Sequence, residues 1–208
     1  MSQFDLFSQP ANQFSSLDDV INALKGMKDD PLADAGTNVV VSRGNPDAQL
    51  LIIGEAPGPE ENVKGKPFVG RAGQMLDKVL QAANFDPEKN VYITNSVFRM
   101  PPGEDGKAFR KPTNEEIDYY RPYVFEIIRL IDPRVILLTG NVASQSVLRK
   151  TGITSLRGHW TEMDGRWIMP IFHPSYLLRN PDRSSGSPKA LMWEDIREVR
   201  RKYDELTK

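Results

Sequence analysis

The stretch "AQLLIIGEAPGPEENVKGKPFVGRAG" (residues 48–73) joins an apolar run to a rigid, acidic loop. The run "LLII" has no polar interruption, which is typical of a strand that is covered on both faces of a parallel sheet. The loop that follows holds five glycines, three prolines and three glutamates within residues 54–73. Glycines let a ligand approach the backbone closely, and prolines stiffen the path of the chain. The stretch therefore predicts a buried strand that ends at a ligand-binding loop.

The rest of the chain alternates strands with helices in the same way. Three further strands are predicted at residues 90–97, 134–140 and 167–174, the last preceded by a hairpin turn at 163–167. Helical patterns occupy the segments between and around them, at residues 17–28, 70–85, 113–132, 141–149 and 187–206. This alternation predicts an α/β fold, a three-layer α/β/α sandwich with a central, mainly parallel four-stranded sheet. We expect a flexible tail at residues 1–16 and a single domain at 17–208.

Composition excludes several classes of site. The 208 residues include no cysteine, so disulfides, thiolate nucleophiles and cysteine-ligated metals are excluded. His159 and His173 are the only histidines, too few for a histidine-rich metal site. No apolar run approaches the ~18 residues of a membrane span, and no signal peptide is evident, so a cytoplasmic protein is expected. With a net charge of −1, any nucleic-acid contact must use locally gathered cations.

Three loops leave the carboxyl ends of predicted strands, where ligands bind in parallel sheets. They begin at Gly54, Asn95 and His173. Each has an ordinary structural explanation: Phe68 could be a core residue, Asn95 could cap a turn, and His173 could be structural. The glycine-rich loop has neither a terminal Gly-Lys-Ser/Thr nor a dinucleotide fingerprint, so a small-molecule nucleotide enzyme is disfavoured.

The three loops taken together are more specific. The motifs "GEAPGPEENVKGKPFVGRAG", "VYITNSV" and "FHPSYLLRNP", in this order, resemble the uracil-DNA glycosylase superfamily, and most closely its family 4. The resemblance extends from about residue 31 to residue 201. It implies a DNA repair glycosylase of base excision repair, which flips uracil out of DNA and hydrolyses the N-glycosidic bond, leaving an abasic site. The alternative is a non-turnover or tightly retaining binder of uracil-containing DNA.

The resemblance implies a role for each strand-end residue. Phe68 stacks on the flipped base, Asn95 pairs with its amide edge, and His173 donates to the base O2 as negative charge develops there. Gly54 completes the uracil-binding set. The best-known relatives carry an aspartate that positions the attacking water where this chain has Ala56.

Two glutamates of the first loop are therefore the candidates for holding the water and stabilising the sugar cation. They are Glu55 and Glu61, and the sequence leaves the role shared between them.

The resemblance also implies DNA contacts around "PSYLLR". Leu177 or Leu178 would wedge the duplex, Arg179 would hold a phosphate or base, and Ser175 would clamp a phosphate. The segment at 98–116 is longer than usual and resembles an inserted loop of a related group, in which a histidine bonds covalently to the abasic sugar. No histidine occurs in this segment, where Arg110 stands near that place, so turnover rather than covalent capture is expected. Further cations that could contact phosphates are Arg71, Lys107, Arg110, Lys111, Arg183 and Lys189.

Family 4 enzymes carry a four-cysteine iron–sulfur cluster, from which this chain departs. The alignment of motifs places Met27, Asp30, Arg99 and Tyr120 at the cysteine positions. No cluster, and no other cofactor, is expected. An Asp30–Arg99 ion pair, or packing by Met27 and Tyr120, is the predicted substitute.

A second partner is suggested by "QFDLF" at residues 3–7. It resembles the short peptide by which bacterial repair proteins bind the sliding clamp. In that reading Gln3, Leu6 and Phe7 make the contacts, with the two apolar side chains buried on binding. No pattern demands a second copy of the chain, so a monomer is expected.

Overall fold

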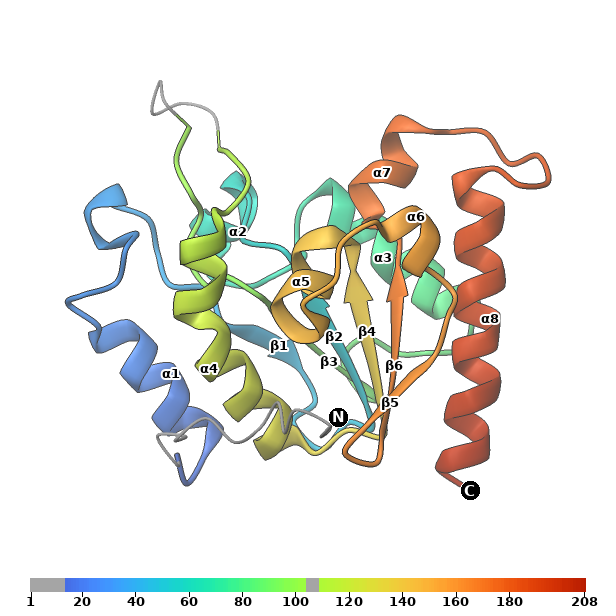
Figure 1. The fold of residues 1–208 in the computed structure, drawn as a ribbon, viewed down its shortest axis with the longest axis horizontal. Helices are drawn as coiled ribbons and strands as arrows, with labels where there is room; N and C mark the ends of the chain where they lie inside the picture. The colour runs from blue at the N-terminus through green and yellow to red at the C-terminus, as the bar shows by residue number, and fades with distance from the viewer. Residues whose placement is uncertain (1–13, 104–108) are drawn as a thin grey trace, which may run out of the picture.

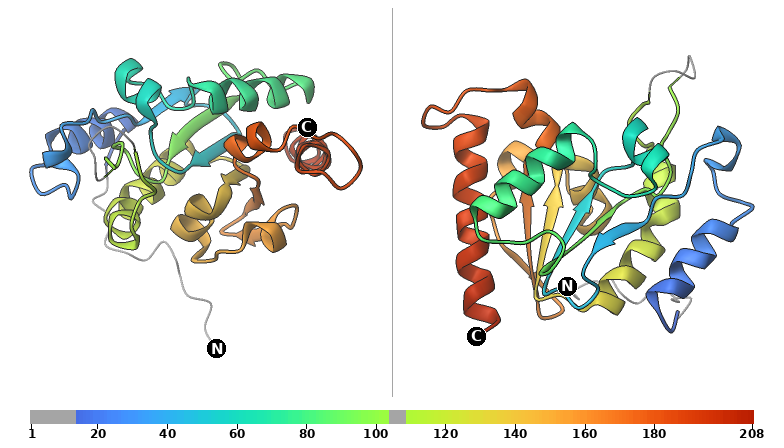
Figure 2. Two further views of the ribbon diagram at one scale, coloured as in Figure 1. Left: turned by 90° about the horizontal axis from the view of Figure 1, so that it is seen from above. Right: turned by 180° about the vertical axis from the view of Figure 1, so that it is seen from behind.

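The computed structural model describes residues 14–103 and 109–208. Its centre is one six-stranded sheet in the order β1-β3-β2-β4-β6-β5, with helices on both faces (Figures 1 and 2). The strands are β1 (Ser42–Gly44), β2 (Leu50–Gly54), β3 (Val91–Asn95), β4 (Val135–Thr139), β5 (Thr161–Met163) and β6 (Arg166–Ile171).

The predicted α/β sandwich with a mainly parallel sheet is confirmed. β3, β2, β4 and β6 are mutually parallel and correspond to the four predicted strands. β1 and β5 add short antiparallel edges, so the sheet has two strands more than predicted. β5 belongs to the expected hairpin, whose turn residues Asp164 and Gly165 both have positive φ. β1 spans only three residues, too few to show a periodic pattern.

Helices cover the two faces of the sheet unequally. One face carries α1 (Leu17–Gly26), α4 (Asn114–Ile131) and α5 (Gly140–Leu148), and the other carries α3 (Arg71–Ala82) and α8 (Pro188–Leu206) (Figure 2). The short helices are α2 (Pro59–Lys64), α6 (Ile153–Leu156), α7 (Pro174–Arg179) and a 3₁₀ turn at Ala33–Ala35. Among the described residues, no helix is long and apolar enough to cross a membrane.

The apolar run of β2 explains the layering. Leu51 and Ile53 pack into the core beneath α1 and α4, whereas Leu50 and Ile52 pack into the core beneath α3 and α8. All four side chains are fully buried. Alternate residues of a strand point to opposite faces, so only a strand covered on both sides needs an unbroken apolar sequence.

Helix ends follow their capping residues. Ser16 caps α1, and its hydroxyl accepts a hydrogen bond from the Asp19 amide at 3.2 Å. Thr113 and Glu116 form a reciprocal capping box at the start of α4. Just before α1, Phe14 is held on α4, because its amide donates to Glu126 and its carbonyl accepts from Arg129.

The parallel strands all end at one edge of the sheet, drawn uppermost in Figure 1. Helices α2 and α7, and the described parts of the loop between β3 and α4, lie at the same edge. This arrangement brings the three loops predicted from the sequence to one side of the molecule.

Candidate active site

Gly54, Asn95 and Phe68 meet where β2 and β3 end. Gly54 pairs with Asn95 in the parallel register of the two strands. A Cβ atom at Gly54 would lie 2.3 Å from the Asn95 side-chain oxygen and 2.4 Å from the Phe68 ring. No side chain fits there, so glycine is required for the amide and the ring to lie this close together. Within the described part of the chain, the side-chain amide of Asn95 makes no hydrogen bond. It is therefore available to a ligand.

Phe68 is buried beside Gly54 and has an unusual backbone conformation. Its side chain is only 6 % exposed, and its φ of 54° falls in the left-handed region that non-glycine residues rarely adopt. Its ring centroid lies 6.0 Å from that of His173, at an interplanar angle of 32°. The first and third predicted loops are therefore in contact distance across the site.

His173 is the N-cap of α7. Its Nδ1 accepts a hydrogen bond from the Ser175 amide at 3.2 Å and lies 2.8 Å from the Ser175 hydroxyl. A backbone amide can only donate, so the neutral ring carries its proton on Nε2. Burial, together with the nearby positive charges of Arg179 and Lys111, lowers the pKa of His173 to about 4. The imidazole is thus neutral at physiological pH.

Glu55 follows directly on β2 and is half-buried. Burial raises the pKa of its carboxyl above the usual range, although Lys111 and Arg179 oppose the shift. The same two cations act on Glu55 and on His173, so all four side chains lie around one site.

Glu61 is placed differently from Glu55. Its carboxylate accepts hydrogen bonds from three backbone amides, those of Gly58 at 3.1 Å, Val69 at 3.0 Å and Gly70 at 2.8 Å. These contacts occupy both of its oxygens and tie α2 to the loop that carries Phe68. The two glutamates that the sequence left equivalent are therefore distinct.

Helix α7 corrects one prediction. Leu177 is 1 % exposed and belongs to the core beneath α3 and α8, so the structure contradicts its use as a wedge. Leu178 is half-buried, and Arg179 is exposed. Tyr176 is 38 % exposed, so it is an exposed aromatic side chain of α7 that was not predicted as a site residue from the sequence.

The remaining predicted DNA contacts vary in availability. Arg71 and Lys111 are exposed. Arg110 instead forms a two-armed ion pair with Glu116, at 2.6 Å and 2.8 Å, which occupies its guanidinium. Lys189 donates to the Pro181 carbonyl, and Arg183 is exposed. Lys107 and the tail residues Gln3, Leu6 and Phe7 lie outside the described residues.

Comparison with known proteins identifies the family. The profile of the uracil DNA glycosylase superfamily matches residues 41–197. The chain belongs to this superfamily. The matched segment of this glycosylase includes Gly54, Phe68, Asn95 and His173.

Individual relatives agree with the profile. The chain is 38 % identical over 173 residues to the type-4 uracil-DNA glycosylase of Thermotoga maritima, which covers 82 % of this chain and 85 % of the relative. It is 34 % identical over 176 residues to the type-4 uracil-DNA glycosylase of Archaeoglobus fulgidus, covering 80 % and 85 %. For that of Sulfurisphaera tokodaii the identity is 32 % over 173 residues, covering 79 % and 74 %.

The iron–sulfur cluster implied by the family 4 resemblance does not fit this glycosylase. Three of the four expected ligand positions are bonded to one another: Asp30 pairs with Arg99 at 2.7 Å, and the Tyr120 hydroxyl donates to the same carboxylate. The predicted Asp30–Arg99 ion pair is confirmed. Neither a guanidinium nor a phenol can replace a thiolate ligand. In the described ranges, no group of three acidic or histidine side chains is arranged to hold a metal.

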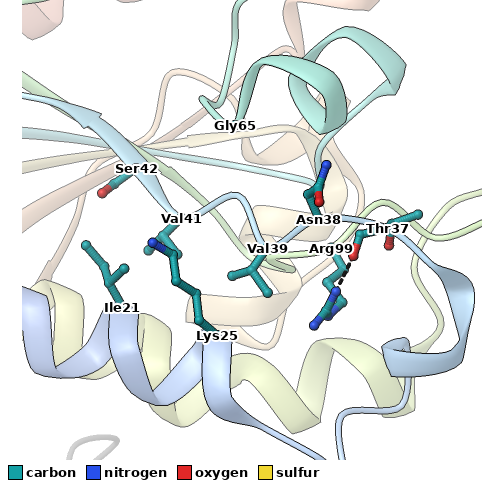
Figure 3. Close-up of a pocket in the computed structure, with 9 residues that line it drawn as sticks. All are labelled: Ile21, Lys25, Thr37, Asn38, Val39, Val41, Ser42, Gly65 and Arg99. Carbon is teal, nitrogen blue, oxygen red and sulfur yellow. Dashed lines mark hydrogen bonds between the residues drawn. The ribbon is translucent and has the colours of Figure 1, made fainter.

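A surface pocket of about 590 Å³ lies beside this network (Figure 3). Ile21 and Lys25 of α1 face it from one side, and Arg99 donates to the Thr37 carbonyl at its edge. Gly54, Phe68, Asn95 and His173 are not among its lining residues, so the pocket is separate from the candidate active site.

Proposed function

We propose that this glycosylase binds uracil flipped out of DNA and hydrolyses its N-glycosidic bond, leaving an abasic site. The observation that carries the proposal is the convergence of Gly54, Phe68, Asn95 and His173 at one edge of the sheet. The four residues come from three separate loops, yet together they supply an aromatic ring, a side-chain amide and a neutral imidazole to one site. Extruding a base costs a few kcal/mol and is cheapest in single strands or at mispairs.

Base recognition belongs to Phe68 and Asn95 in this proposal. The Phe68 ring stacks beneath uracil, an interaction worth ~1–3 kcal/mol. The Asn95 amide accepts from uracil N3–H and donates to O4. Cytosine presents an amine and an unprotonated ring nitrogen at those positions, so it would leave both partners unpaired.

Bond cleavage separates charge into a sugar cation and a uracil anion. The Nε2–H of His173 donates to O2 of the leaving base, where negative charge grows. A preorganised donor of this kind contributes on the order of 3–4 kcal/mol of transition-state stabilisation. The nearby Lys111 and Arg179 favour the same anion electrostatically.

In this proposal Glu55, rather than Glu61, holds the water that attacks the sugar carbon. Glu55 is half-buried at the end of β2 beside the same cations as His173. Once ionised, its carboxylate can orient a water towards the sugar carbon and stabilise the cation that forms there. The oxygens of Glu61 are already occupied by the three loop amides.

The test is multiple-turnover release of uracil. The protein is incubated with an excess of single-stranded oligonucleotide that contains one uracil, and alkali then cleaves the abasic sites. We expect several strands cleaved per protein molecule, none with thymine in place of uracil, and a strong loss in Asn95→Ala. A stoichiometric complex that does not turn over would instead establish the retaining binder.

We also propose that the N-terminal peptide "QFDLF" binds the bacterial sliding clamp. The support is the sequence pattern alone. Binding of the purified clamp to the full chain should be lost in the double variant Leu6→Ala/Phe7→Ala. Binding that survives this change would overturn the assignment.

A further inference from the structure

The backbone of Phe68 needs external support. A left-handed φ of 54° at a bulky aromatic residue is strained, and such residues persist only where their surroundings hold them. Gly73 in the first turn of α3 packs directly on it, because a Cβ atom there would lie 1.8 Å from the Phe68 carbonyl oxygen. The groups that hold the residues on either side therefore decide where the ring lies.

Arg43 holds the chain on the amino-terminal side. This β1 side chain is 7 % exposed, and its Nε donates to the Pro67 carbonyl at 3.0 Å while Nη2 lies 3.3 Å from the Phe68 carbonyl. Asp77 of α3 fixes the same nitrogen at 2.6 Å. One buried guanidinium thus joins the edge strand, the Phe68 loop and α3.

Glu61 holds the chain on the carboxyl-terminal side. One of its oxygens accepts from both the Val69 and Gly70 amides, at 3.0 Å and 2.8 Å. Arg43 therefore binds the carbonyls up to Phe68, and Glu61 binds the amides directly after it. Charged hydrogen bonds of this kind are roughly twice as strong as neutral ones.

We propose that Arg43 and Glu61 form a two-sided clamp that positions Phe68 beneath the flipped uracil. Both are positioning residues, since each acts through Phe68 rather than on the substrate. The inference rests on the proposed glycosylase function for the role of the ring. It adds Arg43, whose position in a three-residue edge strand gave no signal in the sequence.

The variant Arg43→Lys tests the clamp, because lysine can keep the Asp77 ion pair but cannot bind two carbonyls with a planar fork. With saturating protein, we expect the cleavage rate of the uracil strand to fall about tenfold, equivalent to a barrier higher by roughly 1.4 kcal/mol. Affinity for the thymine strand should stay unchanged. Glu88→Gln is the matched control, since Glu88 pairs with Arg43 at 3.1 Å, is 70 % exposed and, among the described residues, makes no hydrogen bond to the Phe68 loop.

A double-mutant cycle separates positioning from general stabilisation. If Arg43 acts through Phe68, Arg43→Lys should cost almost nothing further in a Phe68→Leu background. Equal losses in both backgrounds would overturn the clamp. So would an unchanged rate in Arg43→Lys when the unmodified protein turns over normally.

Amide hydrogen exchange provides a readout that does not depend on activity. The Val69 and Gly70 amides should exchange faster in Glu61→Gln and in Arg43→Lys than in Glu88→Gln. If the unmodified protein releases no uracil, the proposed function fails while exchange still tests the clamp. Unchanged protection of both amides would overturn the clamp whatever the activity.

Discussion

At the scale of single residues, the same surroundings treat His173 and Glu55 differently. Burial disfavours the charged form of both, so it lowers the pKa of His173 and raises that of Glu55. Lys111 and Arg179 add to the first shift and oppose the second. The site thereby holds a neutral imidazole and a carboxyl group whose ionisation is opposed by burial and favoured by the two cations. In the proposed function, these environments suit His173 to donate a hydrogen bond to the leaving uracil and Glu55 to orient the water.

This division predicts the pH dependence of cleavage. Glu55 must be ionised to act, and its raised pKa lies above the pKa of about 4 of His173. As the pH falls, the rate should therefore decline first through the titration of Glu55. Single-turnover rates between pH 4 and pH 8 should show this decline in the unmodified protein and in Glu61→Gln.

The variant Glu55→Gln should lose activity by about 100-fold, within the range of a general base. Its residual rate should no longer decline between pH 8 and pH 5, where His173, with a pKa of about 4, stays mostly neutral. A decline that persists in Glu55→Gln would assign the titration to another group. Normal rates in Glu55→Gln would remove Glu55 from the mechanism.

His173 should also make stability depend on pH. Its pKa is lowered from 6.5 to about 4 on folding, so the unfolded chain binds more protons between these values. The stability associated with the neutral His173 is fully present above pH 6.5 and is lost as the pH falls towards 4. The free energy of unfolding should drop by on the order of 2 kcal/mol from this group between pH 8 and pH 5. Urea titrations at several pH values should show that the free energy of unfolding falls more between pH 8 and pH 5 in the unmodified protein than in His173→Asn. An equal fall in the two proteins would contradict the lowered pKa of His173.

At the scale of elements, the network of Asp30, Arg99 and Tyr120 joins three parts of the chain. Asp30 follows α1, Arg99 follows β3, and Tyr120 lies in α4. The family resemblance pointed to these positions through the missing cysteines, which is why the Asp30–Arg99 pair could be predicted. Sequence could not show that the tyrosine completes the network, because the hydrogen bond spans 90 residues.

Removing Asp30 should therefore be costly. Its side chain is 1 % exposed, and Asp30→Ala would leave the Arg99 guanidinium, 13 % exposed, without its carboxylate. We expect a loss of about 3–5 kcal/mol in the free energy of unfolding, as for other broken buried pairs. Asp118→Ala is the control, since its pair with Arg149 is exposed, and such pairs contribute about 0–1 kcal/mol. Equal effects of the two changes would show that the network does not replace the cluster structurally.

Helix α7 shows where sequence patterns were insufficient. The consecutive leucines of "PSYLLR" look alike in sequence, but the helical turn buries Leu177 and leaves Leu178 half-buried. Leu177→Ala should cost about 2–5 kcal/mol of stability, as for other buried leucines. Leu178→Ala should leave stability within about 1 kcal/mol, which thermal unfolding can compare directly. A larger loss in Leu178→Ala would reverse the assignment.

At the scale of the whole molecule, the chain order of strands and helices was sufficient to predict the sandwich and the edge that carries the site. The unbroken run of β2 and the strand-end residues Gly54, Asn95 and His173 made this possible. The difference between Glu55 and Glu61 and the contribution of Arg43 could not be predicted, because they depend on hydrogen bonds to distant backbone atoms. The net charge of −1 further means that attraction to DNA depends on a few local cations.

This local charge predicts a weak salt dependence of DNA binding. Arg71, Lys111 and Arg179 are exposed, and none has an ion-pair partner among the described residues, whereas Arg110 is bound to Glu116. Each phosphate contact to a single strand contributes about 0.7 to the slope of log affinity against log salt. Three contacts give a slope of magnitude about 2, far from that of a broadly basic protein.

Lys111→Ala and Arg179→Ala should each reduce the slope by about 0.7. Fluorescence anisotropy with a thymine strand between 50 and about 200 mM salt covers the range in which such slopes are resolved. Arg201→Ala is the control, because Arg201 lies in α8 and is paired with Glu198 and Glu205. If the slope changes with Arg201 but not with Lys111 or Arg179, DNA approaches over α8 and not over the strand ends.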